Sequence, residues 1–147
     1  MKTVNSMKLS FISKSVNESF ARAAVASFLL PLDPTVAQIA DVKTAVSEAV
    51  TNAIVHAYPD AFGTVYIEAR LTDTGRAIIK IRDRGIGIPD IAKAMEPLYT
   101  TSNDERAGLG FAVMQSFTDK VKVRSTVGKG TTVTLEKLIS RSEDGQK

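Results

Sequence analysis

Apolar and polar positions alternate near the start of this chain and then recur with a helical period. The alternation predicts a strand after a loose lead-in over residues 1–6, with one apolar face made by Met7, Leu9 and Phe11. Ser15-Val-Asn-Glu18 then matches a capping box and predicts a helix to about Leu30, stopped by Pro31. Its expected core stripe is Phe20, Ala24 and Phe28, and Arg22 falls off that stripe toward solvent.

A second helical period begins at Asp33-Pro34, where the acid is the expected N-cap and the proline lies in the first turn. The helix is predicted to run unbroken to about Ala57, with an inward row at Ile39, Val42, Val46, Ala49, Val50 and Ala53. A turn cluster over residues 58–63 ends it.

Alternation returns after this turn and predicts two strands joined at residues 73–75. The first strand has its apolar face at Val65, Ile67, Ala69 and Leu71. In the second, over residues 77–83, one face carries Ile79, Ile81 and Asp83. A carboxylate at the end of an apolar row is costly to bury without partners, so Asp83 is a candidate ligand-binding residue.

The pattern weakens from Asp90 to Ala107, a length of irregular chain typical of a functional lid. Gly108-Leu-Gly110 is predicted to open a helix over residues 111–117. A final hairpin is expected around residues 127–130, with inward side chains at Val121, Val123, Val133 and Leu135.

These elements predict one α+β domain over residues 1–147, with residues 1–6 and 141–147 frayed. The expected architecture is a two-layer sandwich, with helices on one face of a mixed, mostly antiparallel sheet. The chain has neither an internal repeat nor a linker that would divide it.

Composition removes several classes of site. Cysteine is absent and one histidine is present, which excludes disulfides, thiolate chemistry and a histidine-rich zinc site. The net charge of +3 comes from interleaved signs, which favours a solvated surface over direct nucleic-acid binding. No apolar run has membrane-spanning length and no signal peptide is recognised at the N-terminus, so we expect a cytoplasmic protein without a membrane partner.

The helix over residues 34–57 carries one polar stripe, because Glu48, Asn52 and His56 recur at every fourth position. Two interpretations are open for this stripe: a satisfied polar seam between helix and sheet, or a ligand site. Asn52 offers an oxygen for a hard cation such as Mg²⁺, which keeps waters and phosphates as other ligands.

The glycine elements add to the ligand interpretation only in combination. Asp83-Arg-Gly85-Ile-Gly87 and Gly108-Leu-Gly110 can each be ordinary turns. Together, an acid can accept the exocyclic amine of adenine, and amides at a helix start attract phosphate. Either Thr131 or Thr132 can assist Asp83, while the other is an ordinary strand residue.

In their order along the chain, these segments resemble the nucleotide-binding boxes of the GHKL ATPase superfamily, which shares the Bergerat fold. Within it, the chain resembles the anti-sigma F factor family of sporulating bacteria, a family of serine kinases. The closer likeness lies in Asn17-Glu-Ser-Phe-Ala-Arg22, Val46-Ser-Glu-Ala-Val-Thr-Asn-Ala-Ile54, Gly85-Ile-Gly-Ile-Pro-Asp-Ile91, Pro97-Leu-Tyr-Thr-Thr101 and Gly128-Lys-Gly-Thr-Thr132.

The resemblance implies a role for each matching position. Asp83 is expected to bind adenine with help from Thr132, Asn52 to ligate Mg²⁺, and Glu48 to act as general base. Arg106 is expected to reach the γ-phosphate of ATP, although it can also be a surface charge. The other ATP-binding positions are Gly85, Gly87, Thr100, Thr101, Gly108, Leu109 and Gly110, while His56 receives no chemical role.

The resemblance also implies partners. A homodimer would hold a sigma factor of the sigma F type, and an anti-anti-sigma factor would compete and be phosphorylated on serine. Arg22 would lie on the surface that both partners touch. Three alternatives remain: a nucleotide-gated sequestering module without transfer, a related stress-response kinase, and direct DNA binding, which the few basic residues disfavour.

Overall fold

The computed structural model describes residues 1–95 and 105–139, with backbone only for residues 105–109. The elements are β1 Thr3–Ile12, α1 Asn17–Phe28, the 3-10 helix η1 Leu30–Leu32, α2 Val36–Val55, β2 Thr64–Thr72, β3 Arg76–Asp83, α3 Ile91–Ala94, α4 Glu105–Phe117, β4 Lys120–Thr126 and β5 Gly130–Leu138. The described part of the chain has no helix long and apolar enough to cross a bilayer.

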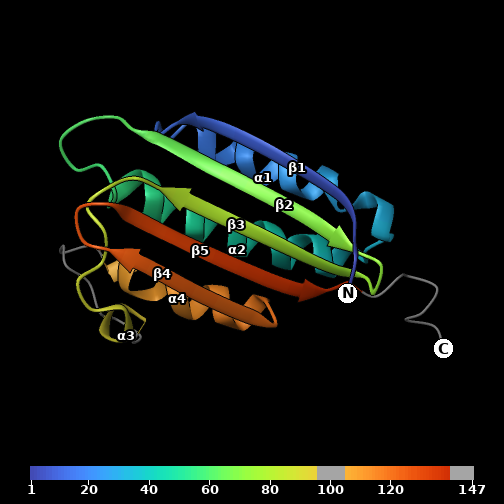
Figure 1. Ribbon diagram of the computed structural model, residues 1–147. Helices are drawn as coiled ribbons and strands as arrows, with labels where there is room; N and C mark the ends of the chain where they lie inside the picture. The colour runs from blue at the N-terminus through green and yellow to red at the C-terminus, as the bar shows by residue number, and fades with distance from the viewer. Residues whose placement is uncertain (96–104, 140–147) are drawn as a thin grey trace.

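The strands form one sheet in the order β1-β2-β3-β5-β4. All four pairings are antiparallel, so the mostly antiparallel sheet is confirmed and no parallel pair occurs among the described strands. Figure 1 shows α1, α2 and α4 behind the sheet, and none of the helices in the described part of the chain covers its other face. The two-layer sandwich expected from the sequence is therefore confirmed.

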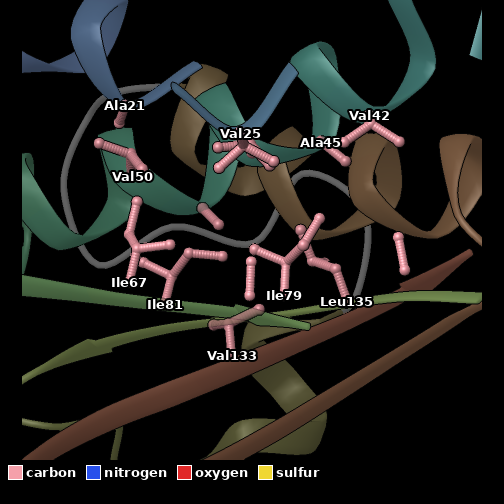
Figure 2. Close-up of a cluster of buried hydrophobic side chains, with 14 of the residues drawn as sticks. Ala21, Val25, Val42, Ala45, Val50, Ile67, Ile79, Ile81, Val133 and Leu135 are labelled. Atoms are coloured by element: carbon pink, nitrogen blue, oxygen red, sulfur yellow. The ribbon is translucent and has the colours of Figure 1, made fainter. Parts of the chain in front are cut away.

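The core lies between α2 and the inward face of the sheet. Because side chains alternate along a strand, each strand contributes every second residue to this layer, as Figure 2 shows for Ile67, Ile79, Ile81, Val133 and Leu135. The helices face them with Ala21 and Val25 of α1 and with Val42, Ala45 and Val50 of α2. Each buried aliphatic side chain contributes about 1.5–3 kcal/mol, so this layer holds α2 firmly on the sheet.

The first strand is longer than its hydrophobic pattern predicts. β1 begins at Thr3 rather than near Met7, and Thr3 and Ser6 pair with Thr72 and Arg70 of β2. The prediction of a loose lead-in is therefore wrong from residue 3 onward. Backbone pairing with β2 orders this segment even though its side chains bury little surface. The expected fraying of residues 141–147 lies outside the described residues.

Helix α1 differs from its prediction at its start and in its buried face. Val16, in helical geometry, is the N-cap, and the amide of Glu18 donates to the Ser15 carbonyl at 3.2 Å, so the predicted capping box is wrong. The buried stripe is Ala21, Val25 and Leu29, one residue beyond the predicted one, and Phe20 is 53% exposed. Small residues on this stripe let α1 approach α2 closely.

Helices α2 and α4 also start elsewhere than predicted. Asp33 takes a left-handed conformation (φ 52°), and Thr35 caps α2 in a reciprocal capping box with Gln38. Five of the six predicted inward residues of α2 are buried, and Ile39 is half-buried. Helix α4 begins at Glu105, so Gly108 and Gly110 lie inside it rather than opening it.

Candidate nucleotide-binding site

The polar stripe of α2 faces a glycine of α4. A Cβ atom added to Gly110 would lie 3.3 Å from Nδ2 of Asn52 and 3.4 Å from Oε2 of Glu48. Both side chains are half-buried, and α4 packs directly on α2. The carboxylate and the amide therefore lie side by side where the α4 backbone approaches them, and any larger residue at position 110 would crowd both.

Asp83 ends β3 with its carboxylate inside the molecule, as the alternation predicts. Its exposed fraction is 7%, and its Oδ1 accepts hydrogen bonds from the amides of Gly85 at 2.9 Å and Thr131 at 3.2 Å. Burial raises the pKa of the Asp83 carboxyl, and these two amide donors oppose that rise. Both bonds go to Oδ1, which leaves Oδ2 as the oxygen that can accept a donor from a ligand.

The loop after β3 is fixed against two neighbouring segments. The amide of Ile86 donates to the Ala57 carbonyl at 2.9 Å, and the amide of Gly128 donates to the Ile86 carbonyl at 2.8 Å. Gly87 has φ 80°, and a Cβ atom there would lie 2.5 Å from the Thr126 carbonyl oxygen. Glycine is required at this position because the backbone turns left-handed against the β4–β5 connection.

These pieces surround one pocket of about 580 Å³, a volume ordinary for small-molecule sites. Asn52 and His56 line it from α2, and Asp83 and Thr131 line it from the sheet. The remaining wall is largely apolar and includes Ala53, Ile81, Ile86, Gly87, Ile88, Phe111, Val127 and Val133. A mainly apolar cavity with a carboxylate at one wall and an amide at another fits a flat base joined to a polar chain.

Comparison with known sequences shows which family this chain belongs to. Residues 14–137 match the family described as a histidine kinase-like ATPase domain. The chain is 55% identical to the anti-sigma F factor of Caldanaerobacter subterraneus over 94% of this chain and 96% of that protein. It is also 55% identical to the anti-sigma F factor of Clostridium acetobutylicum, over 95% of this chain and 98% of that protein. The chain belongs to the anti-sigma F factor family.

Solved structures of other proteins have the same fold as this member of the anti-sigma F factor family. A structure of RsbU and RsbW domains from Mycobacterium tuberculosis matches 94% of this chain with a TM-score of 0.70 and 21% identity. A blue-light activated histidine kinase of Erythrobacter litoralis matches 82% with a TM-score of 0.59 and 20% identity. The chain spans 33% and 41% of those two structures, which therefore support the sandwich architecture alone.

The structure corrects one threonine of the predicted site. Thr132 pairs with Arg82, while Thr131 pairs with Asp83, so the two threonines lie on opposite faces of the sheet. Thr131 is buried beside Asp83, and its hydroxyl is 2.8 Å from that of Ser125. The threonine that faces the pocket is Thr131. It is two residues before Val133 and four before Leu135, so strand alternation puts it on the same buried face.

Gly85 also acts differently from its prediction as a residue lining the ligand. It is absent from the pocket lining, and its amide instead holds the Asp83 carboxylate in place. Gly108 lies in the first turn of α4, and the side chains of Arg106 and Leu109 lie outside the described residues, as do Thr100 and Thr101 entirely. Arg22 lies on α1, away from the pocket lining, with its side chain 39% exposed.

We predict that Gly110→Ala weakens nucleotide binding about tenfold, because a methyl group would crowd Asn52 and Glu48 and overpacking costs about 1–3 kcal/mol. The unliganded protein should lose less than the full packing cost, since alanine favours a helix interior over glycine by about 1 kcal/mol. Calorimetric titration with ATP and thermal unfolding measure the two effects. Ala112→Ser in the same helix is the control, and unchanged affinity in Gly110→Ala would contradict the prediction.

Proposed function

We propose that this chain is an anti-sigma factor that binds a sigma F-type sigma factor and uses Mg²⁺-ATP to phosphorylate a serine of its anti-anti-sigma antagonist. The observation that supports this best is the pocket lined by Asp83 on the sheet and Asn52 on α2. Glu48 lies next to Asn52, where α4 comes close at Gly110. Membership of the anti-sigma F factor family agrees with it.

The adenine would bind between the sheet and the loop after β3. Oδ2 of Asp83 would accept the exocyclic amine, because Oδ1 already takes two amide donors. Gly87 lets the backbone approach the base, and Ile86, Ile88 and Val133 supply apolar contacts. Thr131 is placed to help by a hydroxyl or a bridging water.

The residues present also fit a magnesium ion held mainly by phosphates. Among the described residues no cluster of three or more acidic, histidine or cysteine side chains exists, so no all-protein cage is available there. Asn52 offers one amide oxygen at the pocket wall, and Mg²⁺ characteristically takes few protein ligands beside phosphates and waters. When bound, the ion would neutralise charge on the phosphates.

Glu48 would act on the acceptor serine. It lies one helical turn before Asn52, and its Oε2 is close to the α4 backbone at Gly110. In the transfer, the serine oxygen bonds to the γ-phosphorus, the bond from that phosphorus to the β–γ bridging oxygen breaks, and the serine proton passes to Glu48. Phosphoryl transfer needs alignment and charge neutralisation more than covalent chemistry, which this site can provide.

We propose that the protein acts as a homodimer in the cytoplasm, where a sigma factor acts. Both partners would bind to the helical face of the molecule. Arg22 is half-exposed on α1 and forms an ion pair of 3.7 Å with Glu18 of the same helix. An exposed pair of this kind contributes little to stability, so the guanidinium can exchange this carboxylate for one of a partner.

We expect Arg22→Ala to weaken binding of the sigma factor and of the antagonist about tenfold, through loss of a charged contact. ATP affinity should stay within about twofold, because Arg22 is not among the residues that line the pocket. Surface plasmon resonance with purified partners measures the first effect. Ala23→Ser, on the exposed side of α1, is the control, and equal partner affinity in Arg22→Ala would remove this residue from the interface.

The proposed activity is tested with purified antagonist, γ-labelled ATP and Mg²⁺. Acid-stable label on the antagonist, found as phosphoserine and lost in Asn52→Ala or on removal of Mg²⁺, is the expected result. Acid-labile label would indicate histidine chemistry. Tight ATP binding without any label would leave a nucleotide-gated sequestering module and contradict the kinase proposal.

A further inference from the structure

The face of the sheet opposite the helices is strongly basic. Outward positions alternate with the buried ones, and those with basic side chains are Lys8, Arg70, Arg76, Lys80, Arg82, Lys120, Lys122 and Arg124. The acidic side chains at outward strand positions are Glu68 and Glu136, and Glu136 already pairs with Arg76 at 3.5 Å. This face of the sheet is therefore more positive than the whole chain, whose net charge is +3.

This surface is hollowed at the end where β3 and β4 finish and β5 begins. The hollow has a volume of about 300 Å³ and is lined by the cations Arg82, Arg84, Arg124 and Lys129. The other lining residues are Asp83, Ser125, Thr126, Gly130, Thr131 and Thr132. Arg82, Thr132 and Arg124 are consecutive cross-strand neighbours on β3, β5 and β4. We call these four cations and the space between them the basic hollow.

Two cations of the basic hollow are held in place without an acidic partner. The guanidinium carbons of Arg82 and Arg84 lie 4.7 and 5.0 Å from the centre of the Tyr66 ring. Within residues 1–95 and 110–139, no ion pair is formed by any of the four cations. Like charges held close together repel one another, and a bound anion relieves that repulsion.

We propose that the basic hollow and the adjoining outward face of β4 dock an acidic segment of a partner protein through its carboxylates. Planar guanidiniums ordered on an aromatic ring suit bidentate carboxylate contacts. The row of cations continues to Lys122 and Lys80, beyond the reach of one small anion, which favours an extended ligand. Both guanidiniums lie against Tyr66, so the ring is not an open platform for a nucleic-acid base.

The basic hollow adjoins the nucleotide pocket, because Asp83 and Thr131 line both, but its cations point to the opposite side of the sheet and the docking proposal does not depend on the kinase proposal. Asp83 and Thr131 face the pocket, whereas their neighbours Arg82 and Thr132 face the opposite side of the sheet. Arg84 and Arg124 are both exposed and absent from the pocket lining, so their side chains can be changed without touching the nucleotide site.

The test uses the full chain, a fluorescently labelled peptide of alternating glutamate and serine, and the double variant Arg84→Gln/Arg124→Gln. The parent should bind the peptide in fluorescence anisotropy at about 50 mM salt and more weakly at about 200 mM. The double variant should bind it about tenfold more weakly at low salt. The control Lys14→Gln/Lys43→Gln removes the same charge elsewhere and should change affinity less than about twofold.

Four outcomes would overturn the proposal. Equal weakening in the control variant would show a general charge effect, and full displacement of the peptide by low concentrations of inorganic phosphate would show a small-anion site. Tighter binding of a single-stranded oligonucleotide, lost in the same double variant, would assign the surface to nucleic acid. Dissociation of a homodimer by the double variant in sedimentation would assign the surface to self-association. Unchanged ATP affinity by calorimetry shows that the double variant is folded.

Discussion

Asp83→Asn is expected to lower ATP affinity about a hundredfold while the unliganded protein keeps its thermal stability. Asparagine can still accept the amides of Gly85 and Thr131 through Oδ1. Its Nδ2 then replaces the oxygen proposed to face adenine, so a donor meets the amine donor of the base. A lost hydrogen bond to a charged acceptor costs about 1.5–3 kcal/mol, and opposed donors raise the cost further.

The stability half of this prediction follows from the raised pKa of Asp83. Because burial raises its pKa, the folded protein keeps a proton that the unfolded chain has already released. The free energy of unfolding therefore falls as pH rises from the ordinary carboxyl pKa of 3.8 through the raised pKa. An asparagine side chain does not titrate, so the Asp83→Asn variant lacks this fall and should be at least as stable at neutral pH.

Calorimetric titration with ATP and GTP, and thermal unfolding from acid to neutral pH, measure both halves. The ratio of ATP to GTP affinity should fall, since an amide donor suits the guanine carbonyl better than the adenine amine. Asp60→Asn, which makes the same change at an exposed position, is the matched control. An Asp83→Asn variant that binds ATP like the parent would show that this carboxylate does not recognise the base.

The sequence pattern predicted the sheet side of the site better than the helical side. Period-two alternation placed Asp83 in the buried row of β3, and the structure confirms it. The same rule applied to β5 places Thr131 on the buried face with Val133 and Leu135, and Thr132 on the opposite face. A strand has two faces, and a single buried neighbour decides which one a residue occupies.

The helix errors have a different cause. On α1, the stripes through Phe20 and through Ala21 have the same spacing, and only packing against α2 selects the smaller residues. Near α2, both Asp33 and Thr35 are acceptable caps by residue type, and the left-handed backbone of Asp33 rules it out. Tertiary contacts decide such choices, and the nearness of Gly110 to Asn52 and Glu48 likewise depends on how α4 packs on α2.

Glu48→Gln is expected to lower phosphoryl transfer to the antagonist about a hundredfold or more, with ATP affinity within about twofold of the parent. Glutamine keeps the size of the side chain and its place beside Gly110, but it cannot take the serine proton. Asn52, one turn later, and Asp83, across the pocket, are unchanged, so the nucleotide should still bind. Single-turnover transfer of γ-label, with ATP binding followed by calorimetry, separates the two effects.

Two comparisons make this result specific for a proton acceptor. Ser47→Ala changes the preceding, buried residue of α2 and removes no base, so it should keep most of the transfer rate of the parent. Sequestration of the sigma factor in the presence of ATP should persist in Glu48→Gln, because that variant still binds the nucleotide. If Glu48→Gln transferred phosphate at the parental rate, Glu48 would have only a structural role beside Asn52 and Gly110, and the proton would need another acceptor. A variant that instead loses both transfer and ATP binding would place Glu48 in nucleotide binding, since a general base acts only in the chemical step.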